Sequence, residues 1–121
     1  MTPVSLTLSK VREILNAQVI TGADALDSIS VEHCYAADLM SDVLARQRAN
    51  GILVTGLTNH QAVRTAELAD IRAVCLVRGK KPDVEFVALA REKDIPLMVT
   101  KLTMFEACGL LYLNGLRGVG E

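Results

Sequence analysis

The strongest constraint on this sequence is the alternation, in its second half, of short apolar runs with longer amphipathic stretches. Apolar runs at 52–55, 71–77 and 97–100 predict buried strands, because they are too short and too apolar for surface helices. Helical spacing of apolar residues between them, as at 60–70, predicts connecting helices. Strands joined by helices through short loops predict a βαβαβ unit over residues 51–113, with a parallel sheet and right-handed crossovers.

Capping residues mark the start of the later helices. Asp83 precedes one helix, and Thr103 with Glu106 has the spacing of a capping box at the start of the last. On the helix after Asp83, the side chains expected to face inward are Val84, Val87 and Ala88.

The first third of the chain carries weaker patterns. Thr7 is placed to cap a helix whose apolar residues recur at helical spacing. Strands are expected at 17–21 and 29–37, and Asp38 is expected to cap a short helix after them. These patterns leave the strand order open for residues 17–50.

Length and composition fit a single folded domain. The 121 residues are 50% hydrophobic and 22% charged, which is typical of a globular chain with one core. We expect one α/β domain over residues 1–114, a three-layer α/β/α arrangement with a mostly parallel sheet. Residues 115–121 include three glycines and are expected to form a flexible tail.

Charge and residue usage argue against several classes of partner. The net charge is −1, and only two Phe and two Tyr are present with no Trp, so neither a basic field nor stacking platforms favour nucleic acid. No apolar run reaches the ~18 residues of a membrane span, and residues 1–5 lack the basic segment of a secretory signal, so a cytoplasmic location is expected. Three cysteines without a CxxC pair predict small buried side chains rather than a disulfide framework or zinc site.

Polar and cationic side chains follow each expected strand of the βαβαβ unit. Because ligands of open parallel sheets bind beyond the carboxyl ends of the strands, we expect these side chains to form one anion-binding rim. A phosphate-bearing small molecule, such as a nucleotide, is the expected ligand; the alternative is that they are solvated turn residues. The candidate ligand-binding residues are Thr55, Gly56, Thr58, Asn59, Arg78, Gly79, Lys80, Lys81 and Thr100, with Lys101 and Thr103 beside them.

Catalytic and metal-binding patterns are weak. Neither GxxxxGK[ST] nor GxGxxG occurs, and His33 and His60 stand outside any acid–base or nucleophile motif. Asp38 and Asp42 are one helical turn apart and could share a magnesium ion, but the favoured interpretation is that the first caps the helix and the second faces water. No catalytic residue, metal or cofactor is therefore assigned.

Four segments of the sequence resemble DRTGG domains. They are 38–44 (DLMSDVL), 53–59 (LVTGLTN), 78–83 (RGKKPD), and 95–97 with 103–106 (IPL and TMFE). The resemblance covers nearly the whole chain and extends, at longer range, to the N-terminal domain of HPr kinase/phosphorylase. It implies a three-layer α/β accessory domain without an activity of its own, attached to or serving a larger metabolic or redox enzyme. The kinase's phosphate loop lies in a separate domain, so kinase chemistry is not implied.

Three functions are compatible with these observations. The first is a non-catalytic regulatory domain that senses a nucleotide or other phosphorylated metabolite at the rim. The alternative is a homodimeric assembly module for a larger enzyme, favoured by the high apolar fraction of so short a chain. A remote third is a small enzyme with a nonstandard site, such as His60 with Asp38.

Overall fold

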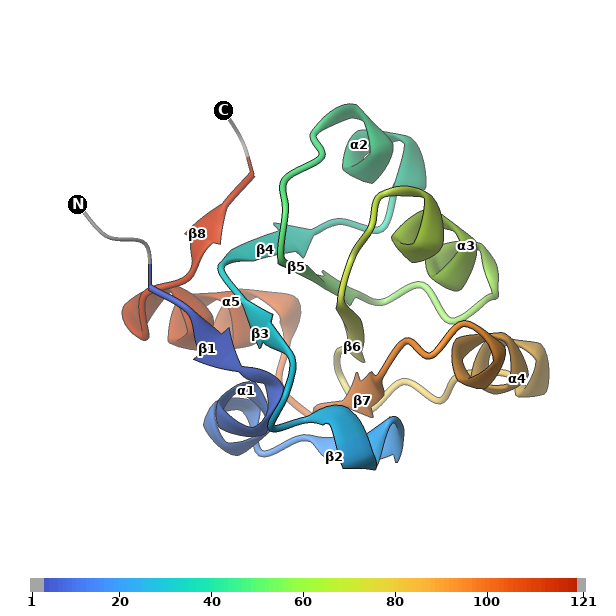
Figure 1. Ribbon diagram of the computed structural model, residues 1–121, viewed down its shortest axis with the longest axis horizontal. Coiled ribbons are helices and arrows are strands. Elements are labelled where there is room, and N and C mark those ends of the chain that lie inside the picture. The colour runs from blue at the N-terminus through green and yellow to red at the C-terminus, as the bar shows by residue number, and fades with distance from the viewer. Residues whose placement is uncertain (1–3, 120–121) are drawn as a thin grey trace.

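The computed structural model describes residues 4–119, which form five helices, a six-stranded sheet and a small two-stranded sheet (Figure 1). The helices are α1 (Leu8–Leu15), α2 (Met40–Ala45), α3 (Gln61–Leu68), α4 (Val84–Glu92) and α5 (Met104–Leu113), with a 3-10 turn at Ala23–Ala25. The main sheet contains β2 (Gln18–Thr21), β4 (His33–Ala36), β5 (Gly51–Thr55), β6 (Ala73–Leu76), β7 (Leu97–Val99) and β8 (Arg117–Gly118). The small sheet pairs β1 (Leu6–Thr7) antiparallel with β3 (Ser30–Val31).

The strand order of the main sheet is β2-β7-β6-β5-β4-β8. The four strands from β4 to β7 lie in chain order and are parallel, and β8 is parallel to β4 at one edge. At the other edge β2 runs antiparallel to β7. The mostly parallel sheet predicted from the alternating pattern is confirmed, and the strand expected at 29–37 is divided between β3 and β4.

Helices cover both faces of this sheet, as Figure 1 shows. On one face the core includes side chains of α2, α3 and α4 together with Leu53 and Val74. On the other face, side chains of α1 and α5 pack with Ile52 and Cys75. Every residue of β5 and β6 is buried, as expected for parallel strands covered on both sides.

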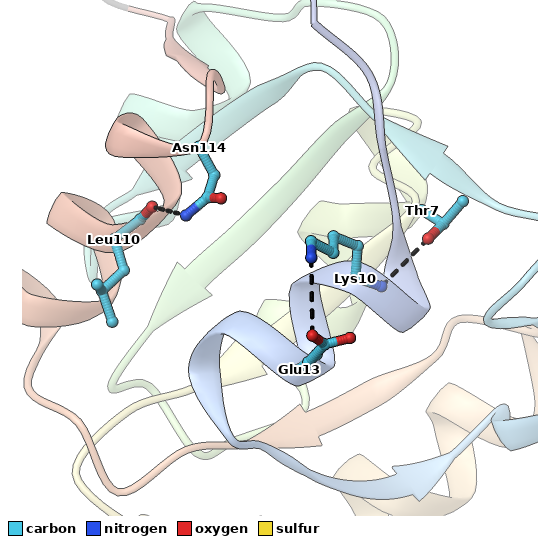
Figure 2. A network of polar contacts seen from close by, with 5 residues as sticks. All are labelled: Thr7, Lys10, Glu13, Leu110 and Asn114. Atoms are coloured by element: carbon cyan, nitrogen blue, oxygen red, sulfur yellow. Dashed lines mark hydrogen bonds and ion pairs between the residues drawn. The ribbon is translucent and has the colours of Figure 1, made fainter.

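The ends of α1 and α5 are closed by polar side chains (Figure 2). Thr7 Oγ1 accepts a hydrogen bond from the Lys10 backbone N at 3.1 Å, which confirms the predicted cap. In the same helix Lys10 Nζ lies 3.6 Å from a Glu13 carboxylate oxygen. At the end of α5, Asn114 Nδ2 donates to the Leu110 carbonyl at 2.8 Å.

The caps of α4 and α5 are also as predicted. Asp83 Oδ1 accepts from the Phe86 backbone N at 2.7 Å, and Thr103 with Glu106 forms the full capping box.

The inward face predicted for α4 is wrong for two of its three residues. Val84 is 85% exposed and Ala88 is also exposed, whereas Phe86 is fully buried and Ala90 almost fully. Apolar residues occupy more positions of this helix than one face can bury, so periodicity alone did not select the face. Burial of the aromatic ring removes the most apolar surface from water and decides the orientation.

Part of the expected tail is incorporated into the fold. Leu116 is 1% exposed, and Arg117 and Gly118 form β8 beside His33 and Cys34 of β4. Gly115 has φ +107°, and a Cβ there would stand 2.7 Å from Val4 Cβ, so the turn into β8 requires glycine. Flexibility remains an expectation only for Gly120 and Glu121, which lie outside the described residues.

Within residues 4–119 the helices are all too short, or too polar, to cross a lipid bilayer.

The orientation of α4 yields a direct stability test. Phe86→Ala removes a fully buried ring and should lower the free energy of unfolding by about 3–5 kcal/mol. Val84→Ala, on the exposed side of the same helix, should change it by less than about 0.5 kcal/mol. Urea unfolding followed by circular dichroism measures both, and equal losses would contradict the orientation described above.

Candidate functional site

The connections that follow the neighbouring strands β6 and β7 lead to opposite faces of the sheet. The connection after β6 leads to α4, whereas the connection after β7 leads to α5 on the other face. In open α/β sheets such a divergence opens a crevice at the carboxyl ends of the strands, where ligands bind. The loops at 77–83 and 100–103 are therefore the places to look for a site.

A cavity of about 490 Å³ lies at these loops, on the β7–β2 side. The loop after β6 contributes residues 79–82, and the end of β7 with its following loop contributes residues 99–102. The remaining lining comes from the end of α1 and from β2: Leu15, Asn16, Gln18 and Ile20.

The cavity combines cationic side chains with an apolar lining. Lys80, Lys81 and Lys101 are exposed at it, and no acidic residue lines it. Two amides, those of Asn16 and Gln18, are the other polar side chains near the lysines. The apolar lining comes from Leu15, Ile20, Val99 and Leu102, with Pro82 beside them. This combination suits a ligand that carries both negative charge and a flat or apolar group.

The backbone of the β6–α4 loop is committed to the protein itself. Arg78 and Gly79 have left-handed φ values of 55° and 64°. Their backbone N–H groups donate to the carbonyls of Leu102 at 2.7 Å and Thr100 at 2.8 Å, so the two loops are tied together. Lys80 N donates to Val77 O at 3.1 Å. These three amides are therefore not available to an anion, whereas the lysine side chains are exposed.

The Thr100 side chain is structural, although the residue lines the cavity. It is 1% exposed, and its Oγ1 donates to the Leu15 carbonyl at 2.7 Å while accepting from Leu102 N at 3.3 Å. The hydroxyl therefore joins the end of α1 to the end of β7 and positions two walls of the cavity.

The rim predicted from the sequence is divided in the structure. Gly79, Lys80, Lys81 and Thr100 come together at the cavity, and Arg78 is exposed beside it without lining it. The earlier part of the rim does not line this cavity: Thr55, Gly56, Thr58 and Asn59. Those residues lie at the end of β5 and in the loop after it, and this connection leads to the same face as that of β6, so the two connections do not diverge there.

Asp38 binds the first two of these residues, Thr55 and Gly56. Its Oδ1 accepts from Thr55 Oγ1 at 2.9 Å and from Gly56 N at 2.7 Å. The prediction that Asp38 caps α2 is wrong, because the N-cap of that helix is Leu39 and it has no side-chain cap. The carboxylate instead closes the loop after the neighbouring strand, a long-range contact that local spacing does not show.

Thr58 and Asn59, the other two predicted residues that lie outside the cavity, also have structural contacts. Asn59 Oδ1 accepts from Gln61 N at 3.0 Å in the turn before α3, and the Thr58 carbonyl accepts from Asp83 N at 3.4 Å. These contacts hold the β5–α3 loop against the start of α4.

The cavity residues from α1 and β2 were not expected from the sequence. They reach the site because β2 is antiparallel to β7, so that its first residue, Gln18, lies opposite Val99 at the carboxyl end of that strand. No local pattern in residues 15–20 reports this pairing.

The remaining titratable candidates have other partners or are exposed. His60 Nδ1 lies 3.5 Å from Glu85 Oε2 on α4, and Asp42 is exposed in the first turn of α2. Across residues 4–119 the structure contains no cluster of three or more His, Cys, Asp or Glu side chains able to hold a metal ion.

Removing the Asp38 carboxylate should destabilise the fold. Asp38→Ala leaves buried Thr55 Oγ1 and Gly56 N without their acceptor, and we expect a loss of about 2 kcal/mol in the free energy of unfolding. Asp42→Ala is the matched control and should cost less than about 0.5 kcal/mol, because that carboxylate is exposed. Urea unfolding of both variants measures the difference; a similar loss in both would show that the Asp38 contacts add nothing specific.

Comparison with known proteins places this fold in a family. The sequence profile of the DRTGG domain matches residues 10–112, whereas no curated protein matches the chain. A crystal structure of the CBS and DRTGG domains of the regulatory region of Clostridium perfringens pyrophosphatase, complexed with the activator diadenosine tetraphosphate, is similar with a TM-score of 0.66 and 18% identity. The match covers 87% of this chain and 45% of that chain, and at this identity it shows likeness of fold. Because the profile spans most of the sequence, the chain belongs to the DRTGG domain family.

Proposed function

We propose that this DRTGG domain is a regulatory module that binds a phosphate-bearing ligand of the nucleotide class at the cavity of Lys80, Lys81 and Lys101. The observation that carries the proposal is the set of three exposed lysines at one cavity with no acidic residue in its lining. Within the described part of the chain, none of the three forms an ion pair. Their charge is therefore available to a ligand.

The chemistry of the lining favours a nucleotide over a simple anion. Lysine ammonium groups bind phosphate oxygens as point charges, and three of them match a di- or triphosphate better than a single phosphate. The apolar side chains of Ile20 and Val99 offer a surface for a base. The amides of Asn16 and Gln18 can hydrogen-bond to the polar edge of a base or to a sugar. A volume of about 490 Å³ is within the usual range of small-molecule sites.

The structural neighbour supports the same class of ligand. Its regulatory region, which contains a DRTGG domain, was crystallised with diadenosine tetraphosphate as an activator of a pyrophosphatase. The present chain corresponds to 45% of that neighbour's length. We infer that it regulates a larger enzyme, metabolic or redox in nature, with which it associates.

Binding rather than turnover is the role assigned to the cavity. Its side chains are lysines, amides, one buried threonine and apolar groups. General acid–base catalysis of phosphate chemistry usually uses a carboxylate or an imidazole at the reacting atom, and neither is among the residues that line this cavity.

Thermal unfolding against a panel of nucleotides, dinucleoside polyphosphates, acyl phosphates and inorganic phosphate tests this function. A selective ligand at one hundred times its dissociation constant stabilises by about 2.7 kcal/mol, which should raise the midpoint by on the order of 8–13 °C. The triple variant K80A/K81A/K101A should lose the shift. A matched variant, K10A/R64A/R91A, removes three exposed cations elsewhere and should keep it.

Two results would count against the lysine cavity. One is a flat panel with every compound. The other is an equal loss of the shift in both triple variants, which would indicate a general effect of net charge.

A second role, homodimeric assembly, is favoured by the outer face of α5. Phe105, Tyr112 and Leu113 are 86%, 62% and 81% exposed, and their i, i+7 and i+8 spacing places them on one broad side of the helix, two turns apart. Gly109 lies between them along the helix, with open space where a Cβ would stand. Exposed apolar side chains concentrated in this way are typical of protein contact surfaces. We propose a second copy of the chain as the partner, and this role is compatible with ligand sensing.

Light scattering at micromolar concentration tests assembly. We expect a dimer for the native chain and a monomer for the variant F105E/L113E. The control L68E/V84E places the same charges on exposed apolar positions of α3 and α4 and should remain dimeric. A monomeric native chain, or dissociation by the control variant alone, would contradict assembly through α5.

A further inference from the structure

Two of the three cysteines, far apart in the sequence, meet between a strand and a helix. Cys34 lies in β4 and Cys108 in α5, which packs against β4 on the α1/α5 face of the sheet. The two side chains interact with each other, and both cysteines are free. Packing of α5 on β4 therefore places the two cysteines against the same part of the core.

The two thiols differ in access to solvent from the third. Cys34 and Cys108 are both partly buried at the margin of the core, whereas Cys75 is fully buried in the centre of β6. A small oxidant in solution can thus reach the thiol pair at the helix but not Cys75.

The pKa values of the two thiols are shifted in opposite directions. The interaction with Cys34 outweighs the effect of burial and lowers the pKa of Cys108 to about 7. The interaction with Cys108, followed by burial, raises the pKa of Cys34 well above its usual value. Burial raises the pKa of Cys75 to about 12. At neutral pH only Cys108 therefore has an appreciable thiolate fraction, and the thiolate is the nucleophilic form.

We propose that Cys34 and Cys108 are a redox-sensitive pair that hydroperoxides convert into a reversible intramolecular disulfide. The Cys108 thiolate attacks a peroxide oxygen, the O–O bond breaks, and Cys108 becomes a sulfenic acid while hydroxide leaves. The Cys34 sulfur then attacks the Cys108 sulfur, and the thiol proton leaves with the sulfenic hydroxyl as water. Two thiols are oxidised by two electrons, one hydrogen peroxide is reduced to two waters, and a dithiol reductant reverses the change.

The disulfide would join α5 covalently to β4. The reduced domain holds this helix only by packing and by the loops at its ends, so oxidation adds a constraint that a contact between side chains does not provide. This pair lies on the face of the sheet opposite α4, and the inference does not depend on the lysine cavity.

Mass spectrometry of the full chain tests the proposal directly. The reduced protein is treated with hydrogen peroxide, unfolded in denaturant, alkylated and digested without reductant. We expect alkylation of Cys75 alone, a peptide pair linked through Cys34 and Cys108, and a mass lower by two hydrogen atoms than that of the reduced chain. Dithiothreitol should restore all three free thiols.

Variants separate the two steps. In Cys34→Ser the reaction should stop at the sulfenic acid of Cys108, which dimedone traps. In Cys108→Ser both remaining thiols should stay alkylatable after peroxide treatment. Cys75→Ala is the matched control, and it should still form the bridge.

The peptide map of the native chain decides the matter even if a variant fails to fold. The proposal is overturned if Cys34 remains alkylatable while Cys108 is oxidised to the sulfinic acid. It is overturned equally if Cys108 pairs with Cys108 of a second chain, or if both thiols stay free.

Discussion

The need to cover both faces of the central strands organises the whole molecule. Every residue of β5 and β6 is buried, and their apolar side chains alternate between the two cores. Right-handed crossovers between successive neighbouring strands can cover only one face, and here α2, α3 and α4 do so. The opposite face is left to α1 and α5, so the chain after β7 must leave in the other direction. That reversal separates the β6 and β7 connections and creates the place where the lysine cavity lies.

The threonine side chains at the strand ends stabilise the fold through hydrogen bonds within the protein. Thr55 and Thr100 are both buried, and each hydroxyl donates to a partner distant in sequence, Asp38 and the Leu15 carbonyl respectively. Buried hydroxyls without partners cost free energy, so a threonine at the end of a covered strand needs such a contact. Among the described residues, no buried side-chain nitrogen or oxygen lacks a partner. Among the described residues the three lysines of the cavity form no ion pair, which is why the proposed binding role falls on them.

The two proposed sites use different faces of one sheet and different chemistry. The cavity carries positive charge on exposed loops, which suits reversible capture of an anion from solution. The thiol pair is enclosed between β4 and α5, where burial and a neighbouring thiol set the reactivity of sulfur. The apolar side chains proposed for dimer contact lie on the same helix as Cys108, so the redox state of α5 and assembly through α5 can be examined together.

The amino-acid sequence by itself determined the elements whose causes are local. Periodicity predicted the strands and helices after residue 50, and capping chemistry at Thr7, Asp83 and Thr103 marked where three helices begin. It also identified the loop residues Gly79, Lys80 and Lys81, because polar residues following an apolar run are visible in the sequence. Tertiary structure alone decided the partner of Asp38, the buried face of α4, the contribution of Gln18 and Ile20 to the cavity, and the meeting of Cys34 with Cys108. Each of these depends on which strands become neighbours and which helices cover them, and residues distant along the chain carry no local pattern that reports their contact.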